Sequence, residues 1–150
     1  FFDGYHGMPD ATIEAWRDLW FRTGDAGLVD EDGYLTFTGR LTDSVRRRGE
    51  NVSAWEVERV LTEHKDVSEA AVFGVPSDLG EEEVMAVVVG DGVDLQELWR
   101  YAAAKLPGFA VPRYMRVQDE LPKTPTGRVQ KHQLNGVDGE TSEWECGLTR

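Results

Sequence analysis

The sequence predicts an α+β (α/β-like) fold in which a central sheet of about three strands is flanked by helices. Two mostly apolar runs, residues 67–75 and 84–89, predict strands, and segments with helical periodicity lie on either side of them. The second run is nearly continuous, which is typical of a strand buried on both faces. Strands that alternate with helices indicate a small sheet covered by helices.

The length and net charge of the chain limit the number of domains and the kinds of partner that we expect. The chain has 150 residues, 40% of them hydrophobic, and a net charge of −12, so we expect one domain or a domain with a piece of another. So acidic a chain repels nucleic acid and anionic lipid overall. No apolar run approaches the ~20 residues of a membrane span. Because the first residue is Phe1 rather than methionine, we expect a piece of a longer protein.

The numbers and positions of the cysteine and histidine residues argue against disulfides and metal sites. Cys146 is the single cysteine, so no disulfide can form within the chain, and a cytoplasmic location is expected. The three histidines lie far apart in sequence without metal-ligand spacing, so no metal site is expected among them.

The first forty residues predict a short helix capped by Asp10, a strand, a break and a hairpin around a polar turn. The expected ranges are 11–16 for the helix, 18–22 for the strand, 25–27 for the break, and 28–29 and 34–38 for the hairpin strands.

The rest of the chain predicts an extended pair, then helices and strands in alternation. Ser53 followed by Glu56 forms a capping box, and Asp94 is a second helix cap. The extended pair passes through Val45 and Val52 and turns at 49–51, the helices cover 54–64, 95–105 and 129–134, and a third strand covers 114–117. Residues 136–150, rich in Gly, Glu, Ser and Thr, are expected to be disordered.

The stretch 39–58 concentrates fixed charge and turn residues. Arg46, Arg47 and Arg48 precede Gly49, whose missing side chain lets the backbone approach a ligand closely. These arginines could meet phosphates, or they could be solvent-facing charges that balance an acidic chain. The residues alone leave both interpretations open.

Asp25 and Arg40 also have two interpretations each. A carboxylate at a turn can accept hydrogen bonds from ribose hydroxyls, or it can cap the turn. An arginine at the end of a hairpin can donate a fork of hydrogen bonds to ribose or phosphate, or it can form a surface ion pair, for instance with Asp43.

Three ordered motifs, WFRTGD at 20–25, GRLTDSVRRRGENVSAWEVE at 39–58 and LPKTPTGRVQK at 121–131, give the chain its strongest signal. Their order resembles the carboxyl-terminal part of the adenylate-forming enzymes, over roughly residues 1–135. The resemblance implies that residues 1–40 end a large N-terminal AMP-binding domain and that residues 41–135 form a small mobile C-terminal domain.

The resemblance also assigns roles to the first two motifs. It implies that Asp25 binds the ribose of ATP and that Arg40 contacts the nucleotide. It places the hinge of the mobile domain at Thr42, with Asp43 beside it. In relatives the position of Thr42 often carries an aspartate or lysine, and a hinge needs permissive dihedrals more than a particular side chain.

Two further roles concern coenzyme A and adenylation. Arg47, Arg48 and Gly49 would line the path of coenzyme A. Arg128 stands where the family usually has a lysine that stabilises the charge developing during adenylation. Three interpretations follow: Arg128 substitutes for that lysine, Lys131 or Lys123 reaches in as a backup, or adenylation is weak.

The activity implied is that of an AMP-forming acyl-CoA synthetase, which joins a carboxylic acid to coenzyme A and converts ATP to AMP and pyrophosphate. ATP with Mg²⁺, coenzyme A, the acid and the protein's own N-terminal domain are the expected partners, and Mg²⁺ is expected to be held mainly by that N-terminal domain. The fragment alone should be inactive. Three alternatives stay open: a degenerate module that binds nucleotide or coenzyme A, a peptide-synthetase adenylation domain, and an acidic interaction domain without a ligand. The tail shows no carrier-protein segment, which favours a stand-alone ligase.

Overall fold

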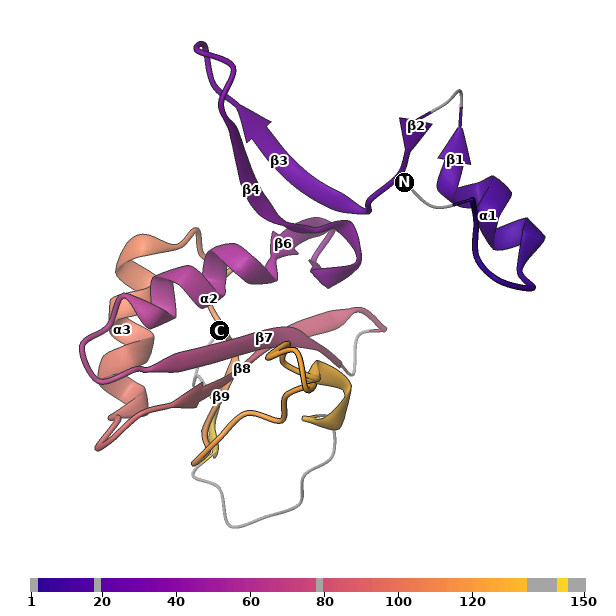
Figure 1. Ribbon diagram of the computed structural model, residues 1–150. Helices are drawn as coiled ribbons and strands as arrows, with labels where there is room; N and C mark the ends of the chain where they lie inside the picture. Colours follow the sequence, from indigo (N-terminus) through magenta and orange to yellow (C-terminus); the bar gives the residue numbers. More distant parts are fainter. Residues whose placement is uncertain (1–2, 18–19, 78–79, 135–142, 146–150) are drawn as a thin grey trace. The chain divides into compact units, whose positions relative to one another are not determined.

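The computed structural model describes residues 3–17, 20–77, 80–134 and 143–145, and the chain divides into two compact units. The first unit is Phe1–Thr42 and the second is Asp43–Arg150 (Figure 1). The domain boundaries implied by the family resemblance stay a prediction.

The first unit begins with a helix and a pair of two-residue strands. Helix α1 (Pro9–Ala15) begins at Pro9 rather than after Asp10, so the predicted cap was wrong; proline is favoured in the first turn, because its fixed φ suits a helix and its missing N–H is not needed there. Strand β1 (Trp16–Arg17) pairs antiparallel with β2 (Trp20–Phe21). Of the strand predicted at 18–22, Trp20–Phe21 is confirmed and Arg22 lies outside it, while residues 18–19 are not among the described residues.

An antiparallel hairpin, β3 (Asp25–Val29) and β4 (Leu35–Arg40), completes the first unit. The predicted hairpin is confirmed, but the break expected at 25–27 was wrong, since these residues are the start of β3. A register shift between Ala26 and Gly27 accommodates the glycine within the strand. The Asp30 carboxylate accepts hydrogen bonds from the amides of Asp32 and Tyr34 and so closes the turn.

A mixed sheet is the centre of the second unit. Strand β7 (Glu69–Pro76) pairs antiparallel with β8 (Glu82–Val89), which pairs parallel with β9 (Tyr114–Val117). These three strands confirm the expected sheet. A fourth strand, β10 (Glu143–Glu145), pairs antiparallel with β9, so the disorder expected for 136–150 does not hold at those three residues. The rest of that tail lies outside the described residues.

Helices α2 (Ala54–Thr62) and α3 (Leu95–Lys105) begin at the predicted caps. Their apolar sides pack with Val72, Val84 and Val88 of the sheet in one core cluster. A second cluster, on Ala71, Met85 and Val87 of β7 and β8, packs Leu121 and Leu134 from the C-terminal segment. Because successive side chains of a strand point to opposite faces, these clusters place the helices and that segment on opposite faces of the sheet (Figure 1).

The last predicted helix is shorter than expected, and a hairpin precedes α2. Residues expected as a helix at 129–134 form only a 3-10 turn, η2 (Lys131–Gln133). Strands β5 (Ser44–Arg47) and β6 (Glu50–Ser53) form a hairpin with a two-residue turn at Arg48 and Gly49. The turn was predicted at 49–51, one residue late. In the described part of the chain, no helix is both long and apolar enough to cross a membrane.

Candidate functional site

Asp25 and Arg40 are brought together in the first unit. They face each other in the register of β3 and β4, and Arg40 Nε donates to Asp25 Oδ1 at 3.2 Å. Their side chains remain 38% and 41% exposed, respectively. The ion pair expected for Arg40 therefore forms with Asp25 and not with Asp43. An exposed carboxylate beside a guanidinium can bind the hydroxyls of a ribose from two sides.

The boundary between the two units falls at the predicted hinge. A 3-10 turn, η1 (Leu41–Asp43), contains both Thr42 and Asp43, and the units divide between these two residues. The Leu41 amide donates to the Gly24 carbonyl at 2.8 Å, so the chain is anchored to the first unit just before the division. The hinge assignment of Thr42 and Asp43 stays a prediction.

The three adjacent arginines have different environments. The side chain of Arg47 is only 3% exposed and forms an ion pair with Glu83, which is equally buried. A cofactor phosphate cannot reach a guanidinium held in this way, so the predicted coenzyme A contact of Arg47 is corrected to a structural one. Burial lowers the pKa of Arg47, and the Glu83 carboxylate opposes this change.

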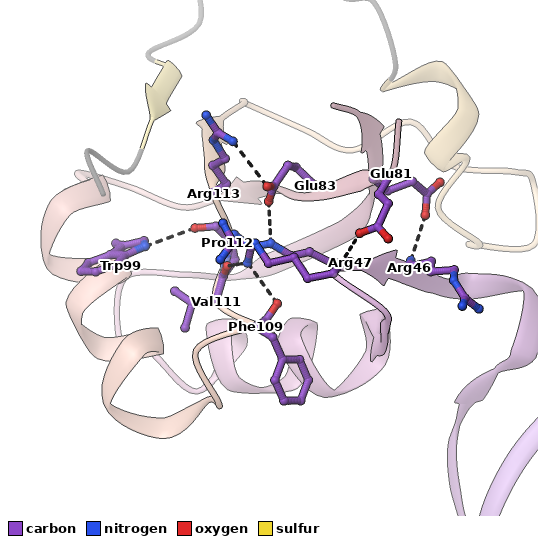
Figure 2. A network of polar contacts seen from close by, with 11 residues as sticks. Arg46, Arg47, Glu81, Glu83, Trp99, Phe109, Val111, Pro112 and Arg113 are labelled. Carbon is purple, nitrogen blue, oxygen red and sulfur yellow. Dashed lines mark hydrogen bonds and ion pairs between the residues drawn. The ribbon is translucent and has the colours of Figure 1, made fainter. Parts of the chain in front are cut away.

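Figure 2 shows that residues from several elements of the second unit surround Arg47. Arg47 Nη1 donates to the carbonyl oxygens of Phe109 at 3.0 Å and Val111 at 2.8 Å. Arg113 Nη1 lies 3.4 Å from the other Glu83 oxygen, Oε1. The group thus joins β5, β8 and the loop between α3 and β9 through charge-assisted hydrogen bonds and ion pairs.

Sequence reasoning missed Glu83 and Arg113, although a signal existed. Glu83 comes directly before the continuous apolar run of β8, where a strand is buried on both faces. A carboxylate at such a position requires a cation nearby.

The two acidic residues before Glu83 accept hydrogen bonds from the backbone of the hairpin. Glu82 Oε2 accepts from the Arg46 amide at 3.0 Å, and the Glu81 carboxylate accepts from the Arg48 amide.

Arg48 and Gly49 form the tip of the hairpin, and both are exposed. Their φ angles are +52° and +82°, as a two-residue hairpin turn of the primed type requires. Nothing lies within 4 Å of the position that a Gly49 side chain would occupy. A ligand can therefore approach this turn along its backbone.

Arg128 also follows a tight turn. The Gly127 amide donates to the Thr124 carbonyl at 2.9 Å, the Arg128 amide donates to Thr124 Oγ1 at 3.1 Å, and Gly127 has a φ of +81°. Lys123 and Val129 close the turn as a β-bridge. Within the described residues the Arg128 guanidinium has no hydrogen bond or ion pair, and the residue is exposed.

Lys123 and Lys131, the two lysines that could take the place of Arg128 in adenylation, already form ion pairs. Lys131 Nζ lies 2.8 Å from Glu58 Oε1 and 3.7 Å from Asp43 Oδ2. Lys123 Nζ lies 2.6 Å from Glu69 Oε2. Both lysines would have to break ion pairs before they could reach a substrate, whereas Arg128 would not. Among the described residues, no three His, Cys, Asp or Glu side chains are grouped to hold a metal ion.

Comparison with known proteins identifies the second unit. Residues 56–128 match the model of the AMP-binding enzyme C-terminal domain. A probable CoA ligase, CCL9 from Humulus lupulus, is 41% identical over 131 residues, which are 85% of this chain and 25% of that protein. The chain thus spans about a quarter of the length of the curated relatives it matches.

Two solved structures agree in sequence and shape. ATP-bound MatB from Rhodopseudomonas palustris is 38% identical with a TM-score of 0.81, over 88% of this chain and 27% of that one. The amide bond synthetase McbA from Marinactinospora thermotolerans is 40% identical with a TM-score of 0.80, over 88% of this chain and 28% of that one. This chain therefore belongs to the adenylate-forming ligase family and carries its AMP-binding enzyme C-terminal domain.

Proposed function

We propose that this chain is the C-terminal part of an ATP-dependent acid–thiol ligase that makes an acyl-adenylate and passes the acyl group to coenzyme A. The observation that carries the proposal is the exposed Arg128 guanidinium after the Thr124–Gly127 turn, unpaired within the described residues, in a chain 41% identical to a probable CoA ligase. Because the chain spans about a quarter of that relative, the reaction needs the rest of the protein.

Adenylation would use Asp25, Arg40 and Arg128. The Asp25 carboxylate would accept hydrogen bonds from the ATP ribose, and Arg40 would orient that carboxylate through the 3.2 Å bond. Arg128 would neutralise the charge that develops as the acid attacks the α-phosphate. Mg²⁺ would accompany ATP, and we assign it to no residue of this chain.

Thioester formation would use the other exposed turn. Rotation about Thr42 and Asp43 would present Arg48 and Gly49 to the acceptor, since the units divide at that point. The open backbone at Gly49 would admit the thiol arm of coenzyme A, and Arg48 supplies an exposed cation for its phosphates. The carboxylic acid stays unassigned, since no residue of this chain is proposed to bind its acyl part.

The test is ATP–pyrophosphate exchange on the complete protein that carries this chain, with a panel of carboxylic acids. Arg128→Ala should lower exchange by roughly a hundredfold, the scale of losing one charge-stabilising group, while Arg128→Lys should retain most of it. Lys105→Met, which removes an exposed ion pair with Glu63, is the matched control and should leave exchange unchanged.

Two other results would change the proposal. Exchange that is indifferent to Arg128 but lost in Lys131→Met would move the adenylation cation to Lys131. Measurable ATP binding without exchange for any acid would favour a degenerate nucleotide-binding module.

A second candidate differs only in the acceptor. Similarity to the amide bond synthetase McbA, at 40% identity, favours an amine in place of the thiol. After adenylation has been established, coenzyme A and a panel of amines can be offered in parallel. Product with amines alone would replace the thiol-ligase proposal, and transfer to a carrier-protein thiol would place the chain in a peptide synthetase.

A further inference from the structure

The ion cluster of Arg47, Glu83 and Arg113, in which Arg47 and Glu83 are buried and Arg113 is half-buried, takes no part in the reaction proposed above. We propose that Glu83 is a positioning residue for the acceptor step: by holding Arg47, it keeps the Arg48–Gly49 turn in the shape that admits the acceptor. This inference rests on the proposed function, because it assumes that the acceptor passes this turn.

Arg47 is held in place by contacts with two other parts of the second unit. Its guanidinium and the Glu83 carboxylate are each 3% exposed, and Arg47 Nη1 also binds two carbonyl oxygens of the loop before β9. Trp99 Nε1 donates to the Pro112 carbonyl in the same loop at 3.2 Å. The turn end of the β5–β6 hairpin is therefore joined to β8 and to a loop that α3 also holds.

Arg47 is directly connected to the Arg48–Gly49 turn. Arg47 is the residue immediately before Arg48 and pairs with Glu50 across the hairpin. The Arg48 amide is bound by Glu81, two residues before Glu83, and Arg48 keeps a φ of +52° that few side-chain-bearing residues adopt. Such a backbone persists only where its surroundings over-determine it, so moving Glu83 should relax the turn.

A positioning role of Glu83 can be distinguished from a role in stability alone. A buried ion pair generally adds little stability over an apolar pair of similar size, whereas removing one partner leaves an uncompensated charge and is costly. The double variant Arg47→Met/Glu83→Leu should therefore restore the fold that the single variant Glu83→Leu weakens. It would not restore the bonds from Arg47 to Phe109 and Val111.

The experiment measures both half-reactions on the complete protein. Variants are Glu83→Leu and Arg47→Met/Glu83→Leu, with Lys105→Met as the control for loss of an ion pair elsewhere in the same unit. We expect kcat/KM for coenzyme A to fall roughly tenfold to a hundredfold in both test variants, the scale of a small misplacement of reacting groups. ATP–pyrophosphate exchange should stay within about twofold, because Arg128 lies on another segment.

Hydrogen exchange on the 150-residue chain provides a readout that does not require activity. The Arg48 amide should exchange faster in Arg47→Met/Glu83→Leu, while the unfolding midpoint stays near that of the unsubstituted chain.

Two outcomes overturn the inference. In one, both half-reactions fall together and recover together with the midpoint in the double variant, which is the behaviour of a purely structural residue. In the other, Arg48 exchange and acceptor kinetics are unchanged in every variant. Absence of pyrophosphate exchange in the unsubstituted protein is a different failure, since it contradicts the proposed function itself.

Discussion

Arg46, Arg47 and Arg48 show that three identical neighbours can have different roles. Two are exposed, and the middle one is buried against Glu83. From sequence, the three formed one basic patch, because the strand parity of the hairpin and the position of its partner carboxylate were unknown. The candidates Asp25, Arg40 and Arg128 were accessible to sequence reasoning because each stands within a motif with its own turn residues.

Gly49 provides a test of the hairpin turn at the level of one residue. Gly49→Ala should lower the free energy of unfolding by about 1 kcal/mol, because alanine is strained at a φ of +82°. Added bulk cannot explain such a loss, since nothing lies within 4 Å of the new side chain. Urea unfolding measures the change.

Gly108→Ala is the matched control for this prediction. The space around Gly108 is equally open, and its φ lies outside the positive range. Equal loss of stability in the two variants would contradict the backbone explanation.

Glu63 and Lys105 predict a pH dependence. A hydrogen bond from Lys105 lowers the pKa of Glu63, and the same bond raises the pKa of Lys105. The carboxylate therefore contributes stability above its ordinary pKa of about 4.3, and this contribution is lost as the pH falls through the lowered value. The lysine contributes below about 10.4, and its contribution is lost as the pH rises through the raised value.

Lys105→Met should consequently shift the urea midpoint downwards between about pH 5 and pH 9 and much less at pH 2. Both side chains are 42% exposed, so added salt should reduce the shift. A shift that is the same at pH 2 and pH 7 would mean that the lysine acts through its contact with the Tyr101 ring instead.

At the scale of elements, the caps explain why the helix starts could be predicted. Asp94 accepts hydrogen bonds from the amides of Gln96 and Glu97 at 2.8 and 3.2 Å, and α3 covers the predicted residues. A side chain that satisfies the first amides marks a helix start locally, without tertiary information. The turn at Arg48 was missed because the sequence offered Gly49 as its natural first residue.

The two caps should differ in strength. Asp94→Ala should cost about 1–2 kcal/mol, and Ser53→Ala should cost less, because Ser53 Oγ lies 3.4 Å from the Glu56 amide. Urea unfolding of the two variants ranks them. The reverse order would show that Ser53 stabilises α2 by something other than its cap bond.

At the scale of the whole molecule, the two units differ in what holds them together. In the part of the chain that the structure describes, every buried hydrophobic residue lies between Val45 and Leu134, within the second unit. Large side chains of the β3–β4 hairpin, including Leu28, Tyr34 and Leu35, are instead about 70% exposed. Residues 43–150 should therefore unfold cooperatively with the same midpoint as the full chain.

Deletion of residues 1–42 followed by urea unfolding tests this expectation. A clearly lower midpoint would show that the first unit stabilises the second. Limited proteolysis offers an independent check, because cleavage should be concentrated before Asp43.

The alternation along β5 also has a consequence for how the sequence can vary. Ser44 and Arg46 are exposed, while Val45 and Arg47 are buried. In a library that randomises codons 44–47 and 83 and is selected for folded protein, accepted changes along β5 should follow a period of two. Charged residues would be recovered frequently at positions 44 and 46. A replacement of Arg47 would be recovered mainly together with a second change at Glu83.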